Sequence, residues 1–387
     1  MLPGGLKYGG RLFAQALSRA SLSEAAGLFK QHGVPLQFIC FSVTQENRSS
    51  PLVDTADGWR LCVAPMIDVT DRHCRYFHRL LAPAARLYTE MITTGALLHG
   101  DVPRHLDFDA AEHPVALQLG GSEPDALAQS ARLGERWGYD EINLNCGCPS
   151  ERVQRGAFGA CLMAEPRLVA DCIKAMQDAV AVPVTVKHRL GLDYDEGYDF
   201  VRDFVGHLHD VGCRVFIVHA RNAVLKGLSP KDNREKPPLR YDDAARLKAD
   251  FPDCVFVLNG GIAETGQALS LMKQFDGVML GRAAWHNPGK LTEISSELMP
   301  MRAGSDDGDI VRAMVAYAER EVAKGVPLRM ITKAMLGWMT GRAGARNWRR
   351  MLSDPARLGQ NDPALIGQAW ETLRARTRAG EADTPLG

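Results

Sequence analysis

The sequence of 387 residues has no excess of charge of either sign, because 46 Lys and Arg residues balance 46 Asp and Glu residues. Any affinity for a nucleic acid must therefore come from local clusters of basic residues. Long apolar runs are also missing. The best candidate, residues 36–43, is far shorter than the ~20 residues that a membrane-spanning helix needs. The sequence therefore predicts no membrane association.

Cysteine pairs of the kind that build disulfide frameworks or zinc ribbons are absent as well. The number of cysteines is odd and no Cys-x-x-Cys motif occurs; the nine residues are Cys40, Cys62, Cys74, Cys146, Cys148, Cys161, Cys172, Cys213 and Cys254. Unpaired thiols persist in reducing compartments. We therefore expect a cytoplasmic protein without a structural metal.

Residues 1–58 differ in composition from the rest of the chain. Between Met1 and Gln45 the one acidic residue is Glu24, and the basic residues are Lys7, Arg11, Arg19 and Lys30. This composition resembles a transit peptide, but no helical or strand period is sustained. We interpret the segment as a loose extension outside the fold.

From residue 61 onward, short β-branched runs alternate with amphipathic stretches. The predicted strands are 61–66, 86–91, 115–121, 141–148, 183–189, 215–221, 255–261 and 277–282, and the clearest helices are 124–137, 167–180 and 198–211. Eight strand–helix units predict a (β/α)8 TIM barrel over residues 59–300. An open doubly wound sheet is the alternative, but residues 64–67 lack the glycine fingerprint that it would need.

The polar segment 301–309 is predicted to be a linker. The patterns after it are helical, at 310–324, 329–340 and 363–378, with no strand signal. We expect a small all-helical domain over residues 310–378, followed by a tail at 379–387.

The active site of such a barrel lies at the carboxyl ends of its strands. Lys187 is informative there, because the period of two places Thr185, Lys187 and Arg189 opposite Val184 and Val186. If the valines face the helices, the ammonium group points into the barrel and needs an anionic partner. That partner is either a bound ligand or a carboxylate of the barrel itself.

The ends of the seventh and eighth strands carry a glycine-rich pattern. Asn259, Gly260 and Gly261 follow one strand, and Gly281 and Arg282 follow the next. Loops at these positions form the usual phosphate site of the fold, and glycines let backbone N–H groups approach an anion. The pair predicts a phosphate-bearing cofactor such as FMN. His219 is either a core histidine or a donor to that cofactor.

The fourth strand offers two thiols. Cys146 shares a strand face with Ile142 and Leu144, so we expect it to be buried against the helices. Cys148 lies beyond the strand, on the turn that carries catalytic residues in barrels. Cys148 is therefore the predicted catalytic thiol.

The predicted helical domain is rich in positive charge between residues 327 and 357. Its basic residues are Arg329, Lys333, Arg342, Arg346, Arg349, Arg350 and Arg357, against the single acid Asp354. Trp338 and Trp348 interleave with them. Basic residues with aromatics predict contacts to an RNA backbone and to exposed bases. The alternative is an ordinary solvated helix face.

Together these motifs resemble the tRNA-dihydrouridine synthases, and within them the DusA branch. The resemblance runs from about residue 61 to about residue 370. The matching stretches are 63–66 (VAPM), 70–77 (TDRHCRYF), 88–91 (YTEM), 118–121 (QLGG), 138–145, 147–150 (GCPS), 185–187 (TVK), 219–221 (HAR), 227–234, 259–261 (NGG) and 344–350 (GARNWRR).

The resemblance implies reduction of D-loop uridines, at tRNA positions 20 and 20a, to dihydrouridine with FMN as cofactor and NADPH as reductant. The oligomeric state does not follow from the sequence, and we expect a monomer. It implies that FMN is bound by Pro65, Met66, Ile67, Gln118, Lys187, His219, Asn259, Gly260, Gly261, Gly281 and Arg282. Cys148 would donate the proton. Asn145, Lys231, Arg234, Arg346 and Arg349 would contact tRNA.

The sequence departs from the branch pattern at several positions. Asn222 and Val224 replace the usual Lys and Trp, Cys146 replaces Val, and Val69 replaces Trp. Only the first pair lies beside the expected substrate loop. Two other functions remain open: an FMN-dependent oxidoreductase for free pyrimidines, of the dihydroorotate dehydrogenase type, and a tRNA-binding protein without catalysis.

Overall fold

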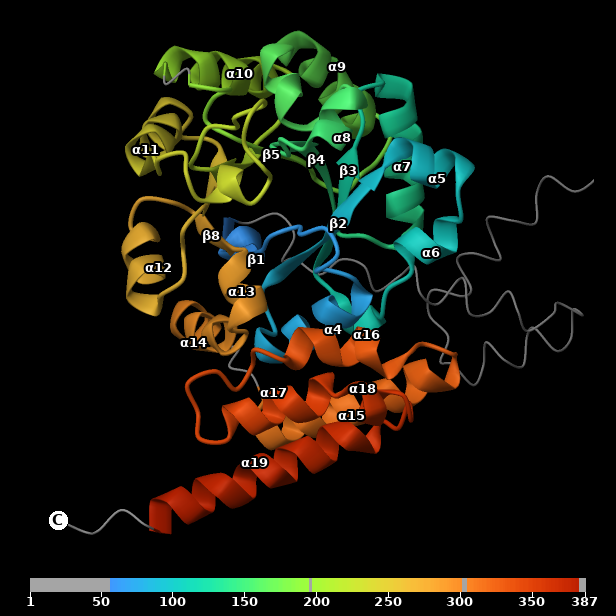
Figure 1. Ribbon diagram of the computed structural model, residues 1–387. Coiled ribbons are helices and arrows are strands. Elements are labelled where there is room, and N and C mark those ends of the chain that lie inside the picture. The colour runs from blue at the N-terminus through green and yellow to red at the C-terminus, as the bar shows by residue number, and fades with distance from the viewer. Residues whose placement is uncertain (1–55, 195–196, 301–304, 383–387) are drawn as a thin grey trace, which may run out of the picture. The chain divides into compact units, whose positions relative to one another are not determined.

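Eight parallel strands close into a barrel in the computed structural model, which describes residues 56–194, 197–300 and 305–382. Each strand pairs with its neighbours in chain order, and β8 pairs with β1 (Figure 1). The strands are β1 Leu61–Val63, β2 Arg86–Thr93, β3 Val115–Gly120, β4 Glu141–Cys146, β5 Val184–His188, β6 Val215–His219, β7 Val255–Asn259 and β8 Gly277–Leu280. The predicted TIM barrel is confirmed.

Helices surround the barrel and continue into a helical region at the C-terminal end. Those of the barrel are α4 Arg72–Leu81, α5 Thr94–His99, α6 Val102–Leu106, α7 Pro124–Trp137, α8 Glu151–Arg155, α9 Pro166–Gln177, α10 Tyr198–Asp210, α11 Tyr241–Asp250, α12 Thr265–Leu271, α13 Arg282–His286 and α14 Gly289–Leu298. Short 3-10 helices occur at η2 Ala56–Trp59, η3 Ala110–Glu112, η4 Gly159–Ala164 and η5 Asp232–Arg234. The C-terminal region contains α15 Asp307–Ala323, α16 Leu328–Thr332, η7 Lys333–Met335, α17 Ala345–Ser353, α18 Pro355–Leu358 and α19 Ala364–Ala382.

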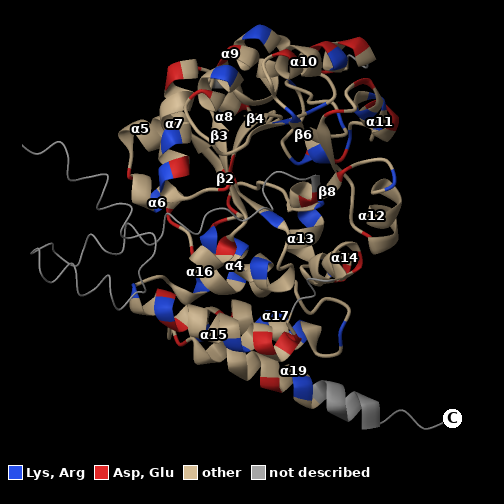
Figure 2. Ribbon diagram, turned by 180° about the vertical axis from the view of Figure 1, so that it is seen from behind, with Lys and Arg blue, Asp and Glu red and all other residues tan. Residues whose placement is uncertain are grey.

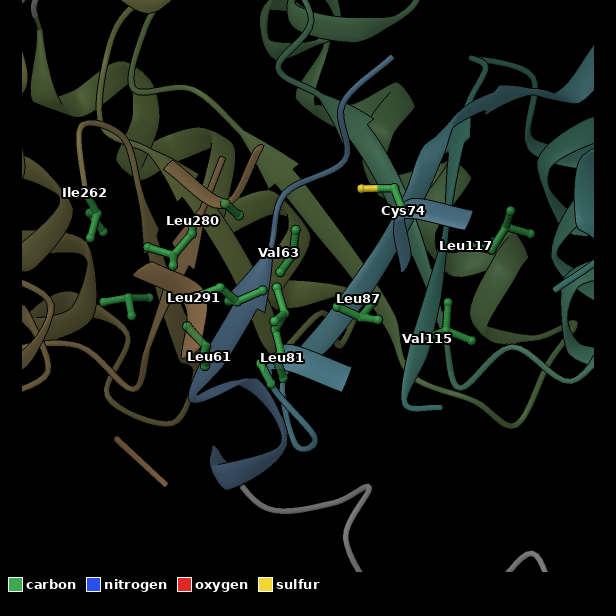
Figure 3. Close-up of a cluster of buried hydrophobic side chains, with 14 of the residues drawn as sticks. Leu61, Val63, Cys74, Leu81, Leu87, Val115, Leu117, Ile262, Leu280 and Leu291 are labelled. Atoms are coloured by element: carbon green, nitrogen blue, oxygen red, sulfur yellow. The ribbon is translucent and has the colours of Figure 1, made fainter. Parts of the chain in front are cut away.

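Alternate residues of the strands face two separate apolar clusters, as the period of two requires. Leu61, Val63, Leu87, Val115 and Leu117 belong to the outer cluster, where they pack with the helices (Figure 3). The inner cluster, within the barrel, consists of Trp59, Cys62, Ala64, Tyr88, Ala116, Val215, Ile217, Val257 and Met279. The barrel interior is therefore a packed core and not a pore.

A buried carboxylate lies inside the barrel. Glu141, at the start of β4, accepts hydrogen bonds from Trp59 Nε1 and Tyr88 Oη, each at 2.8 Å. Arg86 lies 3.2 Å from the same carboxylate and 4.5 Å from the centre of the Trp59 ring. A buried charge needs such partners. Residues just before β1 are therefore part of the fold.

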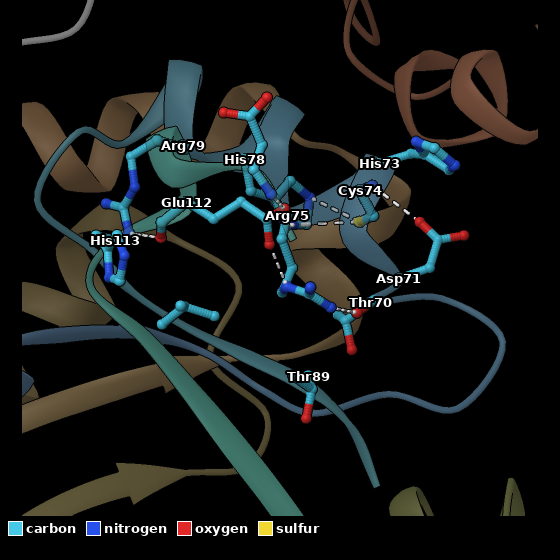
Figure 4. Close-up of polar contacts among 12 residues, drawn as sticks. Thr70, Asp71, His73, Cys74, Arg75, His78, Arg79, Thr89, Glu112 and His113 are labelled. Atoms are coloured by element: carbon cyan, nitrogen blue, oxygen red, sulfur yellow. Dashed lines mark hydrogen bonds and ion pairs between the residues drawn. The ribbon is translucent and has the colours of Figure 1, made fainter. Parts of the chain in front are cut away.

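The motif at residues 70–77 forms the start of α4. Asp71 caps the helix by accepting from the Cys74 N–H at 2.9 Å. Arg75 pairs with buried Glu112 at 2.6 Å and donates to the Thr70 carbonyl oxygen at 2.9 Å (Figure 4). The motif thus fixes the helix to the loops on either side of it.

The helical region packs on the outer face of α4. Tyr317 of α15 stacks on Tyr76 with ring centres 3.9 Å apart, and its hydroxyl lies 2.7 Å from His73 Nδ1. Phe77 meets Trp338 edge to face at 5.4 Å. The described residues from Ala56 onward accordingly belong to one compact unit. The helical C-terminal region expected from the sequence is confirmed.

Two local predictions in this region were wrong. The helix expected at 329–340 ends at residue 335 as α16 and η7, and a series of turns follows. The helix α17 was not predicted, although its buried residues Asn347, Trp348, Met351 and Leu352 recur at helical spacing.

The predicted boundaries at the chain ends are described only in part. Residues 1–55 of the expected loose extension, 301–304 of the expected linker and 383–387 of the tail lie outside the described residues. In the described parts of the predicted extension and linker, η2 already belongs to the barrel and Asp307 already begins α15. No helix in the described part of the chain is long and apolar enough to cross a membrane.

Candidate active site at the carboxyl ends of the strands

Lys187 points into the barrel. Its ammonium group donates to Asn259 Oδ1 at 3.1 Å, and this bond joins β5 to β7, which are separated by β6. It must therefore cross the interior. Among the described residues no carboxylate lies within ion-pair distance of Lys187, and Glu141 is paired with Arg86 instead. This distribution favours a ligand over a structural salt bridge as the anionic partner.

The pKa of Lys187 is lowered to about 7, first by burial and then by the nearby Arg189 guanidinium. Burial, together with Arg189, Lys187, Arg221 and Arg282, also lowers the pKa of His219 well below its usual value. A neutral imidazole can both donate and accept a hydrogen bond. The mouth of the barrel thus has an excess of positive charge around a neutral histidine.

Two arginines of this group are held by backbone carbonyl oxygens. Arg189 donates to the carbonyls of Gly147 and Asn222 at 3.1 and 3.0 Å. Arg221 donates to the carbonyl of Glu235 at 3.2 Å. Neither arginine forms an ion pair with a carboxylate among the described residues, so an anion entering the mouth would be attracted.

The loops after β7 and β8 have the geometry expected of an anion site. Gly260 and Gly261 have φ angles of 121° and 70°, which side chains rarely adopt. A Cβ atom on Gly261 would lie 2.7 Å from Leu239. Arg282 follows Gly281 at the start of α13 and pairs with Glu235 at 2.6 Å. The backbone conformation therefore requires glycine at both Gly260 and Gly261.

Pro65, Met66 and Ile67 form the loop after β1. The Met66 carbonyl oxygen accepts the N–H groups of Val69 and Thr70 at 3.1 and 3.0 Å. Ile67 is 53% exposed, which is unusual for so large an apolar side chain. This position is suited to contact with a bound ring system.

Gln118 and Asn145 are linked inside the barrel. Asn145 Nδ2 donates to Gln118 Oε1 at 2.8 Å, and Gln118 Nε2 donates to Asn143 Oδ1 at 2.7 Å. Asn145 Oδ1 accepts from the backbone N–H groups of Gly147 and Cys148 at 3.1 and 3.0 Å. Asn145 therefore holds the loop that carries the candidate thiol.

The two thiols of this segment have different surroundings. Cys146 is fully buried in the outer, helix-facing cluster, and burial raises the pKa of its thiol. Cys148 is partly exposed on the loop after β4. It also interacts electrostatically with Lys187, Arg189 and Arg234. The placement expected of the two residues matches the structure.

The basic residues expected to contact RNA lie in two separate segments, and Asn145, which is also expected to contact it, lies at the end of β4. Lys231 and Arg234 are exposed in the loop between β6 and α11, and Arg346 and Arg349 are exposed on α17. Figure 2 shows basic and acidic residues interspersed over the helical region. Sequence alone did not assign Arg189, Arg221 or Glu235, although Arg189 shares its predicted strand face with Lys187.

The proposed role of the two tryptophans was wrong. Trp338 and Trp348 are 1% and 0% exposed, and their rings meet edge to face at 5.8 Å. Trp348 Nε1 donates to the Met335 carbonyl oxygen at 2.9 Å. They form the core of the helical region and cannot stack on a base. Asn222 and Val224, which depart from the branch pattern, are buried as well.

Comparison with known proteins gives a consistent result. Residues 62–372 match the family model described as "Dihydrouridine synthase (Dus)". A protein of Xanthomonas campestris pv. campestris named tRNA-dihydrouridine(20/20a) synthase is 54% identical over 82% of this chain and 92% of its own length. Proteins of the same name from Pseudomonas putida and Escherichia coli K12 are each 53% identical, over 82% and 84% of this chain and 95% and 96% of their own. The chain therefore belongs to the dihydrouridine synthase family, whose members are flavoenzymes.

Proposed function

We propose that this enzyme reduces the C5=C6 bond of uridines 20 and 20a in the D-loop of tRNA, with FMN as its flavin and NADPH as the reductant. We further propose that it acts as a monomer in the cytoplasm, without a metal. The observation that carries the proposal is the partly exposed thiol of Cys148 beside the cationic mouth of a barrel of this family.

The residues at the mouth fit FMN. Its phosphate would lie at the ends of β7 and β8, against Gly260, Gly261, Gly281 and Arg282, where the backbone can approach closely. Its ring would lie between the loop of Pro65, Met66 and Ile67 and the side chains of Gln118, Lys187, His219 and Asn259. The uncompensated charge of Lys187 is suited to an anionic ring.

When bound there, the flavin supplies a hydride to C6 of uracil, because the C5=C6 bond is conjugated to the C4 carbonyl. The residues of the chain then have two tasks. Lys187 balances negative charge on the cofactor, and an anion beside it would return its pKa towards its usual value. Cys148 donates the proton that C5 requires. Its loop is held in place by Asn145.

The substrate uridine is stacked within folded RNA, so it must leave the stack to reach the mouth. Lys231 and Arg234 would hold the RNA at the barrel. Arg346 and Arg349 would hold it at the helical domain, which we take as residues 310–378. The Arg346 side chain makes no hydrogen bond or ion pair with any other described residue, which leaves its charge available for a phosphate. Asn145 would contact the nucleotide itself.

The test is reduction of tRNA transcripts by the purified enzyme with FMN and NADPH. Transcripts with cytidine at position 20, at 20a, or at both separate the two sites, and dihydrouridine is mapped along each one. We expect dihydrouridine wherever uridine remains at these positions. Reduction of free uracil or orotate without RNA would favour the pyrimidine oxidoreductase instead. Tight tRNA binding without any dihydrouridine would favour a non-catalytic binding protein.

A further inference from the structure

The hydroxyl group of Ser150 is hydrogen-bonded to the Cys148 thiol. The two residues lie on the loop between β4 and α8, and Cys148 Sγ is 3.6 Å from Ser150 Oγ. Both side chains are partly exposed. The thiol is the donor in this arrangement, and the hydroxyl oxygen is the acceptor.

Ser150 occupies the N-cap position of α8, where a serine hydroxyl ordinarily accepts an N–H group of the first turn. Here the side chain makes no such bond. The N–H groups of Val153 and Gln154 bind the Ser150 backbone carbonyl oxygen instead, each at 3.0 Å. The hydroxyl is therefore directed towards the thiol and does not stabilise the helix.

The backbone around Cys148 is fixed on both sides. Its N–H donates to Asn145 Oδ1 at 3.0 Å, and its carbonyl oxygen accepts the Ala160 N–H at 2.9 Å. The backbone thus limits the directions that the thiol can take. Its contact with Ser150 is thus made from a backbone position that is held on both sides.

A proton donor must be reloaded before each new turnover. Once the thiol proton has gone to C5 of uracil, Cys148 is left as a thiolate among the cationic groups of Lys187, Arg189 and Arg234. Cations stabilise a thiolate and so slow its reprotonation. A neutral hydroxyl beside the sulfur can rotate its O–H bond towards the thiolate and provide a path for the proton.

We propose that Ser150 is the relay that returns a proton to Cys148 after each reduction. The Oγ–H proton passes to Sγ while a water molecule gives a proton to Oγ, so that an S–H bond forms, an O–H bond of water breaks and hydroxide is released to the solvent. No oxidation or reduction accompanies this step. The proposal depends on the proposed function, because it requires Cys148 to protonate C5.

Ser150→Ala distinguishes the reprotonation of Cys148 from the reduction of uracil itself. The resting enzyme already carries the thiol proton, so the first turnover on tRNA, followed as oxidation of the pre-reduced flavin, should be nearly unchanged. Steady-state turnover should fall about tenfold or more, with a larger solvent isotope effect, since removal of a proton-transfer group commonly costs ~10²-fold or more. Ser150→Thr keeps the hydroxyl and should restore turnover. Ser270→Ala, at an exposed serine of α12, is the matched control.

A second measurement needs no flavin. The rate at which iodoacetamide alkylates Cys148, followed on its peptide by mass spectrometry, reports how readily the thiolate forms. Ser150→Ala removes a donor to the thiolate, so alkylation at a fixed pH should slow. The alkylation rate should be unchanged in Ser150→Thr and Ser270→Ala. The melting temperature should change little in all three variants, because the hydroxyl does not cap α8.

The possible results are distinct. Wild-type rates in both steady state and alkylation for Ser150→Ala would overturn the relay while the proposed function stands. A first turnover slowed as much as the steady state would also overturn it, because Ser150 would then act before the proton leaves. Full activity of Cys148→Ala would instead remove the premise shared with the proposed function.

Discussion

Lys333 of the helical region binds Asp71 in the loop after β1, with the ammonium group 2.7 Å from the carboxylate. The same group lies 3.4 Å from the carbonyl oxygen of Asp68. Asp68 has a φ angle of 61°, and its N–H is bound by Glu90 of β2. The helical region therefore contacts the loop that carries Pro65, Met66 and Ile67.

Lys333→Met should loosen this loop more than it destabilises the protein. A partly exposed ion pair contributes roughly 1 kcal/mol or less to stability, whereas the left-handed backbone at Asp68 depends on partners on both sides. We expect FMN to bind several-fold more weakly, measured by the change in flavin fluorescence. Lys324→Met, which removes an exposed lysine that pairs with Glu321 of α15, is the control. Equal effects of the two variants would contradict a specific role for Lys333.

The stability of the flavin-free protein should rise with pH above neutrality because of Lys187. Burial lowers its pKa from 10.5 to about 7, so the unfolded chain binds more protons between these two values. Stability then increases with pH in this window, by up to ~1.4 kcal/mol per pH unit. Below pH 7 the full free-energy cost of burying the charged ammonium group applies. Urea denaturation between pH 7 and 10 measures it. The rise should be weaker in Lys187→Met and unchanged in Lys226→Met, at an exposed lysine.

The two thiols of the β4 segment should respond differently to substitution. Cys148→Ala should retain FMN and tRNA but lose turnover by ~10²- to 10⁴-fold, as expected when a proton donor is removed. Cys146→Val changes a buried apolar position by little volume and should cost less than ~1.5 kcal/mol of stability. Rates of dihydrouridine formation distinguish them, and a similar loss in both variants would remove the distinction.

Residues 1–58 are predicted to be dispensable, although the structure already includes η2, Ala56–Trp59, in the barrel. A chain that begins at Asp57 should fold, bind FMN and reduce tRNA. A chain that begins at Leu61 loses the Trp59 side chain, which is 3% exposed and bound to Glu141. Loss of a buried tryptophan costs ~3–5 kcal/mol. Thermal melting of both chains tests this, and failure of the longer one to fold would refute the prediction.

The exposed arginines of α17 should govern the salt dependence of tRNA binding. Each phosphate contact releases counterions, so Arg346→Ala with Arg349→Ala should flatten the dependence of affinity on salt and cost ~1–3 kcal/mol per contact. Flavin reduction by NADPH should be unaffected. The control is Arg312→Ala with Arg374→Ala, at exposed residues of α15 and α19. An unchanged slope, or a matching loss in flavin reduction, would mean that the α17 arginines serve the fold.

The barrel could be predicted because its strands are short β-branched runs between amphipathic helices. Several strands were predicted to extend beyond the residue at which they end in the structure. The extra residues at 64–66, 147–148 and 260–261 include Pro65, Gly147, Gly260 and Gly261 and belong to the loops. The inward direction of Lys187 followed from the alternation with Val184 and Val186, since that rule depends only on local geometry.

The surroundings of the site could not be predicted, because they depend on contacts between distant segments. Arg189 binds the carbonyl oxygens of Asn222 and Asn233, and no local pattern specifies such pairs. For Trp338 and Trp348, the error came from interpreting the basic residues and the aromatic residues of this segment as a single RNA-binding pattern. The basic residues of α17 lie on one face of the helix and Trp348 on the other.

The hydrogen bonds inside the barrel run in a single direction. Thr185 Oγ1 donates to Glu141, Asn143 Nδ2 to Thr185, Gln118 Nε2 to Asn143, Asn145 Nδ2 to Gln118, and finally the Cys148 N–H to Asn145. A carboxylate can only accept, so Glu141 sets the donor and acceptor ends of every group that follows. The side-chain dipoles are consequently aligned head to tail. A charge at the floor of the barrel thus determines which atom of Asn145 faces the loop at its mouth.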